Sequence, residues 1–248
     1  MSLPNSSVWQ VQLLRVTAFI KDNDRAKEEN WWASLFGEPS ETRTVRSKEG
    51  LFQDEGTFGE GRLILAARSG RVDWTWSVSP IVPIPESPTI PSLGTLVETS
   101  NTLCERMNVW LDLAPSLTRL AFAAVLDQPV AEKEEAYRLL QQYLSAVQLS
   151  PDSSSDFLYQ INRPVASKTL PGHKINRLNK WATLKITITG IRNDETLLQK
   201  ELKVIRLEVD VNTAPEKDMQ IPKEKGKDIL RELANLAQEL ATKGDQPS

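Results

Sequence analysis

The sequence predicts an α+β protein whose helices pack on one face of a curved antiparallel sheet. Segments rich in β-forming residues alternate with amphipathic segments, in the order strand, helix, several strands, helix, and this order occurs twice. A composition of 40% hydrophobic and 25% charged residues in 248 positions is that of a globular protein with a sizeable core. We therefore expect one compact unit of two similar halves, residues 8–115 and 116–242, between disordered ends at residues 1–7 and 243–248.

The first half begins with a predicted strand at Val8–Ile20, which is rich in β-formers. A helix follows, with its N-terminal cap near residue 22. Short strands come next, and Ser69-Gly70 between Arg62–Arg68 and Arg71–Val78 is a two-residue hairpin signal. The half therefore combines one early helix with an antiparallel sheet.

A proline-rich connector and a second helix end the first half. Prolines recur from Pro80 to Pro91 and predict an extended segment, because proline fits neither a helix interior nor a central strand. The helix is expected at about Leu93–Asp112. The second half then repeats the order, with strands at 117–126, 156–162, 174–189 and 197–212 and helices at 131–147 and 223–242.

One segment of the chain is strongly basic. Residues 157–193 contain no Asp or Glu, and their cations give a local charge of about +7. The whole chain has a net charge of −3, so the rest of the molecule is acidic. A localised positive field attracts phosphates or acidic surfaces whatever the total charge. The asymmetry therefore indicates that this segment meets a partner.

The basic segment is expected to form a hairpin. Leu170-Pro171-Gly172-His173 has the sequence of a type II turn. In the following strand, Leu178, Ala182, Leu184, Ile186 and Ile188 alternate with a more polar set, and we expect the apolar set to meet the helices. The polar set would then line the open sheet face. The candidate binding residues are Arg163, Lys174, Arg177, Asn179, Trp181, Lys185 and Arg206.

Three interpretations of this surface stay open. Cations together with an indole suit single-stranded nucleic acid, because phosphates pair with the cations and a base stacks on the ring. The Ile-Asn-Arg triplet at 161–163 and at 175–177 would place such residues in both arms. An anionic small ligand is the second interpretation. The third is an ordinary or protein-contacting surface, with Arg177 paired to Glu208 or Asp210.

Most catalytic and metal chemistry is excluded by residue type. One His and one Cys cannot build a Cys/His zinc site, and no nucleophile elbow is present. His173 is expected to be a turn residue and Cys104 an inert thiol on the inner side of a helix. One nuclease-like set, Asp194, Glu201 and Lys203, has a spacing too short for the usual magnesium-binding pattern. We therefore expect no metal and no cofactor.

Composition also predicts the compartment. The longest apolar run is far shorter than the ~20 residues that cross a bilayer, and no signal peptide is recognisable. A single cysteine fits a reducing environment. These features predict a cytoplasmic protein that does not bind membranes, in a bacterium.

Two motifs carry a family resemblance. The strand Thr118-Arg119-Leu120-Ala121-Phe122 and the ending Leu207-Glu208-Val209-Asp210, followed by a long amphipathic helix, resemble a sporadically distributed, uncharacterised bacterial protein family. The chain lacks the proline-rich opening of that family. The resemblance implies no catalytic residues, and the patchy distribution of the family implies a mobile-element or phage-defence accessory role.

The sequence therefore predicts a non-catalytic binding or adaptor protein that acts through a basic sheet face. A protein partner is expected, and self-association into a homo-oligomer is compatible with the sequence. The alternative is a nucleic-acid-binding protein that uses residues 157–193. An enzyme ranks third.

Overall fold

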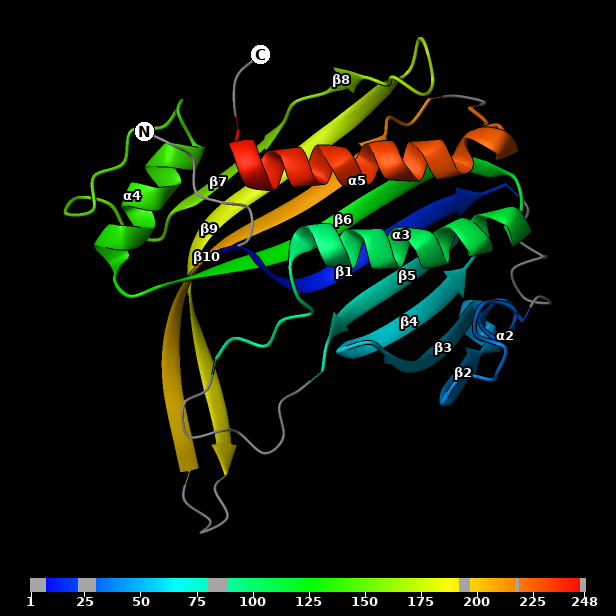
Figure 1. Ribbon diagram of the computed structural model, residues 1–248, viewed down its shortest axis with the longest axis horizontal. Coiled ribbons are helices and arrows are strands. Elements are labelled where there is room, and N and C mark those ends of the chain that lie inside the picture. Colours follow the sequence, from blue (N-terminus) through cyan, green and yellow to red (C-terminus); the bar gives the residue numbers. More distant parts are fainter. Residues whose placement is uncertain (1–7, 22–29, 80–88, 192–196, 217–218, 246–248) are drawn as a thin grey trace.

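The computed structural model describes residues 8–21, 30–79, 89–191, 197–216 and 219–245, except for the side chains of residues 189–191, 197 and 198. It confirms a mixed α+β protein. Ten antiparallel strands form one sheet in the order β2-β3-β4-β5-β1-β6-β10-β9-β7, and β8 pairs with β9. The helices lie on one face of this curved sheet (Figure 1).

The strands are β1 Gln10–Ile20, β2 Thr42–Arg46, β3 Leu51–Phe58, β4 Gly61–Arg68, β5 Arg71–Val78, β6 Leu117–Val130, β7 Leu158–Asn162, β8 Val165–Ala166, β9 Lys174–Ile191 and β10 Leu197–Thr213. The α-helices are α2 Trp31–Phe36, α3 Leu96–Leu113, α4 Lys133–Tyr143 and α5 Gly226–Lys243. Short 3₁₀ turns occur at Ser47–Glu49 and Lys223–Lys225.

The sheet is arranged about its central pair, β1 and β6. These strands are antiparallel, with Val16 opposite Phe122. On one side β1 pairs with β5, the last strand before α3, and on the other side β6 pairs with β10, the last strand before α5. On each side the remaining strands then run outward toward the edge.

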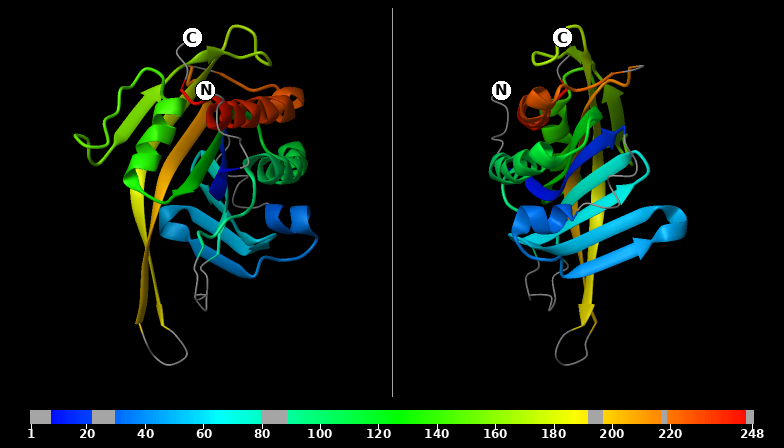
Figure 2. Two further views of the ribbon diagram at one scale, coloured as in Figure 1. Left: turned by 60° about the vertical axis from the view of Figure 1, so that its left-hand side comes forward. Right: turned by 90° about the vertical axis from the view of Figure 1, so that its right-hand side faces the viewer.

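The core lies between the sheet and the helices α3, α4 and α5 (Figure 2). All seven tryptophans are buried there. Trp74 and Trp110 lie edge to face at 6.0 Å between β5 and α3, and Trp31 lies edge to face with Trp110 at 5.7 Å. At the other end of the core, Trp9 contacts Trp181 at 5.9 Å. Large rings therefore fill both ends of the space under the helices.

Local turn signals fold as expected. Gly70 has a φ of 71° in the hairpin between β4 and β5, and Gly172 has a φ of 86° in the turn before β9. In that turn the His173 N–H donates to the Leu170 carbonyl at 3.1 Å, the bond of a closed β-turn. The predicted helix cap near residue 22, residues 80–88 of the proline connector and Asp194 lie outside the described residues.

The C-terminal end of α5 differs from the expectation of a disordered tail from residue 243. Lys243 is the last residue of α5, and Asp245 is buried, with 1% of its surface exposed. Gly244 lies so close to the Tyr143 carbonyl that a Cβ would stand 2.1 Å from its oxygen, so only glycine fits there. The chain is therefore anchored through residue 245.

β9 and β10 continue beyond the rest of the sheet as a two-stranded arm. β6 pairs with β10 only as far as Lys203, and β7 pairs with β9 only as far as Ala182. The two strands stay paired with each other as far as Ile191 and Leu197. Figure 1 shows this arm, which we define as residues 184–191 and 197–203, projecting from the body of the molecule. Within the described residues, no helix has both the length and the apolar character needed to cross a bilayer.

Candidate binding surface on the open sheet face

The expected orientation of β9 is reversed: Arg177, Asn179 and Trp181 lie on the helix side of the sheet, and Leu178 lies on the open face. Trp181 and Asn179 point toward the helices and are each 0% exposed. Trp181 lies opposite Leu207 of β10 and contacts the ring of Tyr143 at 5.1 Å. Within the core, the side-chain oxygen of Asn179 accepts the Trp181 indole N–H at 2.8 Å.

Arg163, another of the candidate residues, forms an ion pair within the protein. Its Nε and Nη2 donate to the two carboxylate oxygens of Asp245 at 2.7 and 2.9 Å. The Tyr159 hydroxyl donates to the same carboxylate at 2.7 Å. Burial raises the pKa of Asp245, but the bonds from Arg163 and Tyr159 outweigh it and hold the pKa below its ordinary value. We call Arg163, Tyr159 and Asp245 the C-terminal latch.

The other four candidate residues lie apart from one another. Arg206 is on the open face, and its Nε and Nη2 donate to the buried Asp127 carboxylate, each at 2.7 Å. Arg177 lies opposite Val211 on the helix side. A hydrogen bond with Lys243 lowers the pKa of Glu239, and the charge of Arg177 lowers it further by a smaller amount. Lys174 and Lys185 are exposed, near one end of β9 and on the arm.

Acidic residues from distant parts of the chain pair with some of the cations of the basic segment. Lys180 donates to both Glu208 oxygens at 3.1 and 3.3 Å, and His173 Nδ1 lies 2.9 Å from Glu216. With the Arg163–Asp245 pair, these contacts reduce the local excess of positive charge. The predicted basic sheet face is therefore a face of paired charges.

A hollow of about 450 Å³ lies on the open face, the face of the sheet opposite the helices. Its floor consists of small side chains, Ala123 and Val125 of β6, and Ala123 is 8% exposed. Its walls are Leu13, Arg15, Gln160, Leu178, Lys180, Glu208 and Asp210, contributed by β1, β7, β9 and β10. Short side chains between longer ones produce this depression on the sheet.

Hydrogen bonds hold the polar side chains of the open face in fixed positions. Asn162 donates to Asn176 at 3.1 Å, Asn176 donates to Asn212 at 3.1 Å, and Asn212 donates to Asp210 at 2.7 Å. Arg15 lies 3.9 Å from the other Asp210 oxygen. The two Ile-Asn-Arg triplets thus supply Asn162 and Asn176 to one network. The face is ordered before any ligand arrives.

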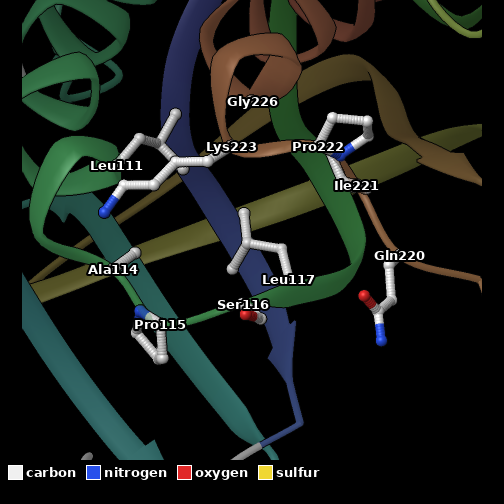
Figure 3. Close-up of a pocket in the computed structure, with 10 residues that line it drawn as sticks. All are labelled: Leu111, Ala114, Pro115, Ser116, Leu117, Gln220, Ile221, Pro222, Lys223 and Gly226. Atoms are coloured by element: carbon white, nitrogen blue, oxygen red, sulfur yellow. The ribbon is translucent and has the colours of Figure 1, made fainter.

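A second pocket, of about 360 Å³, lies where α3 ends and α5 begins (Figure 3). It is formed by the connection from Ala114 to Ser116 and by the segment from Gln220 to Lys223. Lys223 is its one charged lining residue within the described part of the chain, and it is exposed. The sequence analysis did not single out this region, although three lysines in the five residues 223–227 mark it.

Among the described residues, the candidates for catalysis are a protonated thiol, a lysine in an ion pair and an exposed carboxylate. Burial raises the pKa of the Cys104 thiol to about 11, so it stays protonated at neutral pH. Lys203 pairs with Glu132, and Glu201 is exposed on the arm. Within the described ranges, no group of three or more His, Cys, Asp or Glu is placed to hold a metal ion.

Comparison of the chain with protein-family models, with curated proteins and with solved structures finds no match.

Proposed function

We propose that this chain is a non-catalytic binding protein that holds a segment of a protein partner on the open face of its sheet. The observation that carries the proposal is the hollow over Ala123 and Val125, walled by charged side chains and left without a helix in the described structure. A surface whose side chains are already ordered loses little entropy on binding.

Charge pairing favours a protein partner over a nucleic acid. Lys180 with Glu208 and Arg206 with Asp127 present both signs next to each other. The affinity of a protein for a polyanion comes largely from cations that release the counterions of the polyanion. Carboxylates beside those cations lower this affinity. A peptide that carries both charges and an apolar side chain fits the same surface, since Leu13 and Leu178 line it.

We further propose that the two halves are repeats of one unit. The support is the order of the strands in the sheet. In each half the first strand pairs with the last, β1 with β5 and β6 with β10, and the two first strands, β1 and β6, pair with each other. A duplicated unit places β1 and β6 side by side at the centre. The hollow beside that pair then arises at the junction of the repeats.

A substitution that fills the hollow tests the proposed function. Ala123→Trp places a large ring on the floor between Arg15 and Asp210, its neighbours in register. We expect the amount of specific protein partner that co-purifies from the native host to fall at least tenfold. Thermal unfolding of the purified variant verifies that it is folded.

The matched control is Val109→Trp on α3, where Val109 is 47% exposed on the helix side. The control is expected to retain the partner. Retention of the partner by Ala123→Trp, or its loss with Val109→Trp alone, would place the binding surface elsewhere.

A further inference from the structure

Among the described strands, none pairs with the arm as a third strand. From Leu184 onward β9 has only β10 beside it, and before Lys203 β10 has only β9 among the described residues. Two-stranded ribbons are marginal in water, and three or more strands with an apolar face are needed for independent stability. The arm also has an apolar side, on which Leu184 is 36% exposed and Ile186, Ile188 and Leu202 are partly exposed.

The outer edge of β9 offers regularly spaced hydrogen-bonding groups. Odd-numbered residues of β9 direct their backbone groups away from β10, since the Arg177 carbonyl accepts from Arg163 N–H and the Thr183 N–H donates to the Phe157 carbonyl. The even-numbered Lys174 instead accepts from Ala214, beyond the end of β10. The register with β10 is continuous to Ile191. The groups of residues 185, 187 and 189 therefore point outward along the arm.

We propose that the arm is a self-association site, at which β9 of a second copy of this chain pairs antiparallel with β9 about a two-fold axis at Thr187. This register brings residues 185, 187 and 189 of each copy together and forms about six backbone hydrogen bonds. Ile186 of each copy then lies opposite Ile188 of the other copy. The result is a four-stranded sheet, β10-β9-β9-β10. The inference is independent of the proposed function of the open face.

The side chains of the β9 edge suit a second copy. Lys185 is the one charged residue from 184 to 191, and the two-fold register places it opposite position 189 rather than opposite itself. The apolar Ile186 and Ile188 form cross-strand pairs, which stabilise sheets. Proline and closely spaced charges, which protect natural edges from pairing, do not occur along this edge.

The β10 edge is the weaker alternative. The part of the β10 edge without a neighbouring described strand is shorter than that of β9, because β6 already pairs with β10 from Lys203 onward. It also carries the neighbouring charges Lys200 and Glu201. Charged side chains on an edge strand oppose pairing with another strand.

The shape of the molecule leaves room for this contact. The arm projects from the body in all three views, so a second arm can lie along it while the second body sits beyond its end (Figures 1 and 2). A hollow of about 560 Å³ at the base of the arm, lined in part by Tyr137, Leu184 and Lys185, accommodates the end of the second arm.

Sizing of the full-length protein with matched proline variants tests the proposal. The native chain is expected at twice 27.9 kDa by light scattering. Thr187→Pro removes an outward N–H at the two-fold axis and is expected to give the 27.9 kDa monomer. Glu201→Pro is the control, because Glu201 lies opposite Thr187 and faces the other edge, and it should leave the dimer intact.

A native monomer at all concentrations, or a dimer that survives Thr187→Pro, would overturn the proposal. Loss of the dimer in Glu201→Pro but not in Thr187→Pro would move the contact to β10 and also overturn it. Because proline could distort the arm itself, Thr187→Cys provides a second readout. Opposed Cα atoms about 5.5 Å apart at the axis permit a disulfide between copies. We expect a covalent dimer from Thr187→Cys and none from Glu201→Cys, and the reverse result contradicts the register.

Discussion

Trp181 shows at the scale of one residue why the face of a strand is hard to assign. A count of apolar residues along all of β9 predicts that the side of Leu184, Ile186 and Ile188 faces the helices. These residues, however, belong to the arm, which lies beyond the core. Where β9 crosses the body, Ile175 and Trp181 point inward instead, and both are 0% exposed. The alternation of apolar and polar residues in β9 was visible in the sequence, whereas the residue at which β9 leaves the body of the molecule was not.

The buried indole leads to a stability prediction. Trp181→Ala removes a ring that contacts Trp9 and Tyr143 and leaves a cavity, so we expect the free energy of unfolding to fall by about 3–5 kcal/mol in a urea titration. Lys180→Ala, one residue earlier on the opposite face, removes an exposed ion pair and should change it by less than about 1 kcal/mol. Equal stability of the Trp181→Ala and native proteins would contradict burial of the ring.

At the scale of elements, most of the order along the chain was predictable. The alternation of β5, the stripe of α5 and the turn at Gly172 are local signals, and each element forms at the predicted place within a few residues. The partners of the cations were not predictable, because they come from elsewhere. Arg163 meets Asp245, 82 positions away, and Arg206 meets Asp127, 79 positions away. Only the folded sheet brings such pairs together.

The C-terminal latch predicts a pH dependence. The pKa of Asp245 is lower in the folded protein than its ordinary value of 3.8, so the stabilisation is complete above that pH and is lost as the pH falls through the folded pKa. Asp245→Asn should lower the free energy of unfolding by about 1.5–3 kcal/mol at pH 7, since hydrogen bonds to a charged group are lost. The difference from the native protein should shrink as the pH falls below that ordinary value.

Urea titrations at stepped pH values measure this difference. Asp112→Asn is the control, because Asp112 pairs with Lys227 at an exposed site and should cost less than about 1 kcal/mol at any pH. A difference for Asp245→Asn that stays constant between pH 7 and pH 3 would show that the carboxylate charge does not stabilise the fold.

At the scale of the whole molecule, folding brings acidic residues from other parts of the chain next to Arg163 and Lys180 of the basic segment. Asp127 of β6 pairs with Arg206 of β10, and Glu208 of β10 pairs with Lys180 of β9. Asp245 at the C-terminal end pairs with Arg163, which follows β7. The surface that we propose for binding is the open face, where small side chains at the centre of the sheet leave a hollow. Two of the binding residues expected from the sequence, Asn179 and Trp181, build the core instead of the open face.

Site-specific photo-crosslinking in the native host tests most directly whether the open face binds a protein. A photoreactive residue at Leu178 in the hollow is compared with one at Val109 on the helix side. We expect discrete adducts from position 178 that protease removes and nuclease does not, and none from position 109. Adducts from position 109 alone, or nuclease-sensitive adducts from position 178, would contradict this expectation.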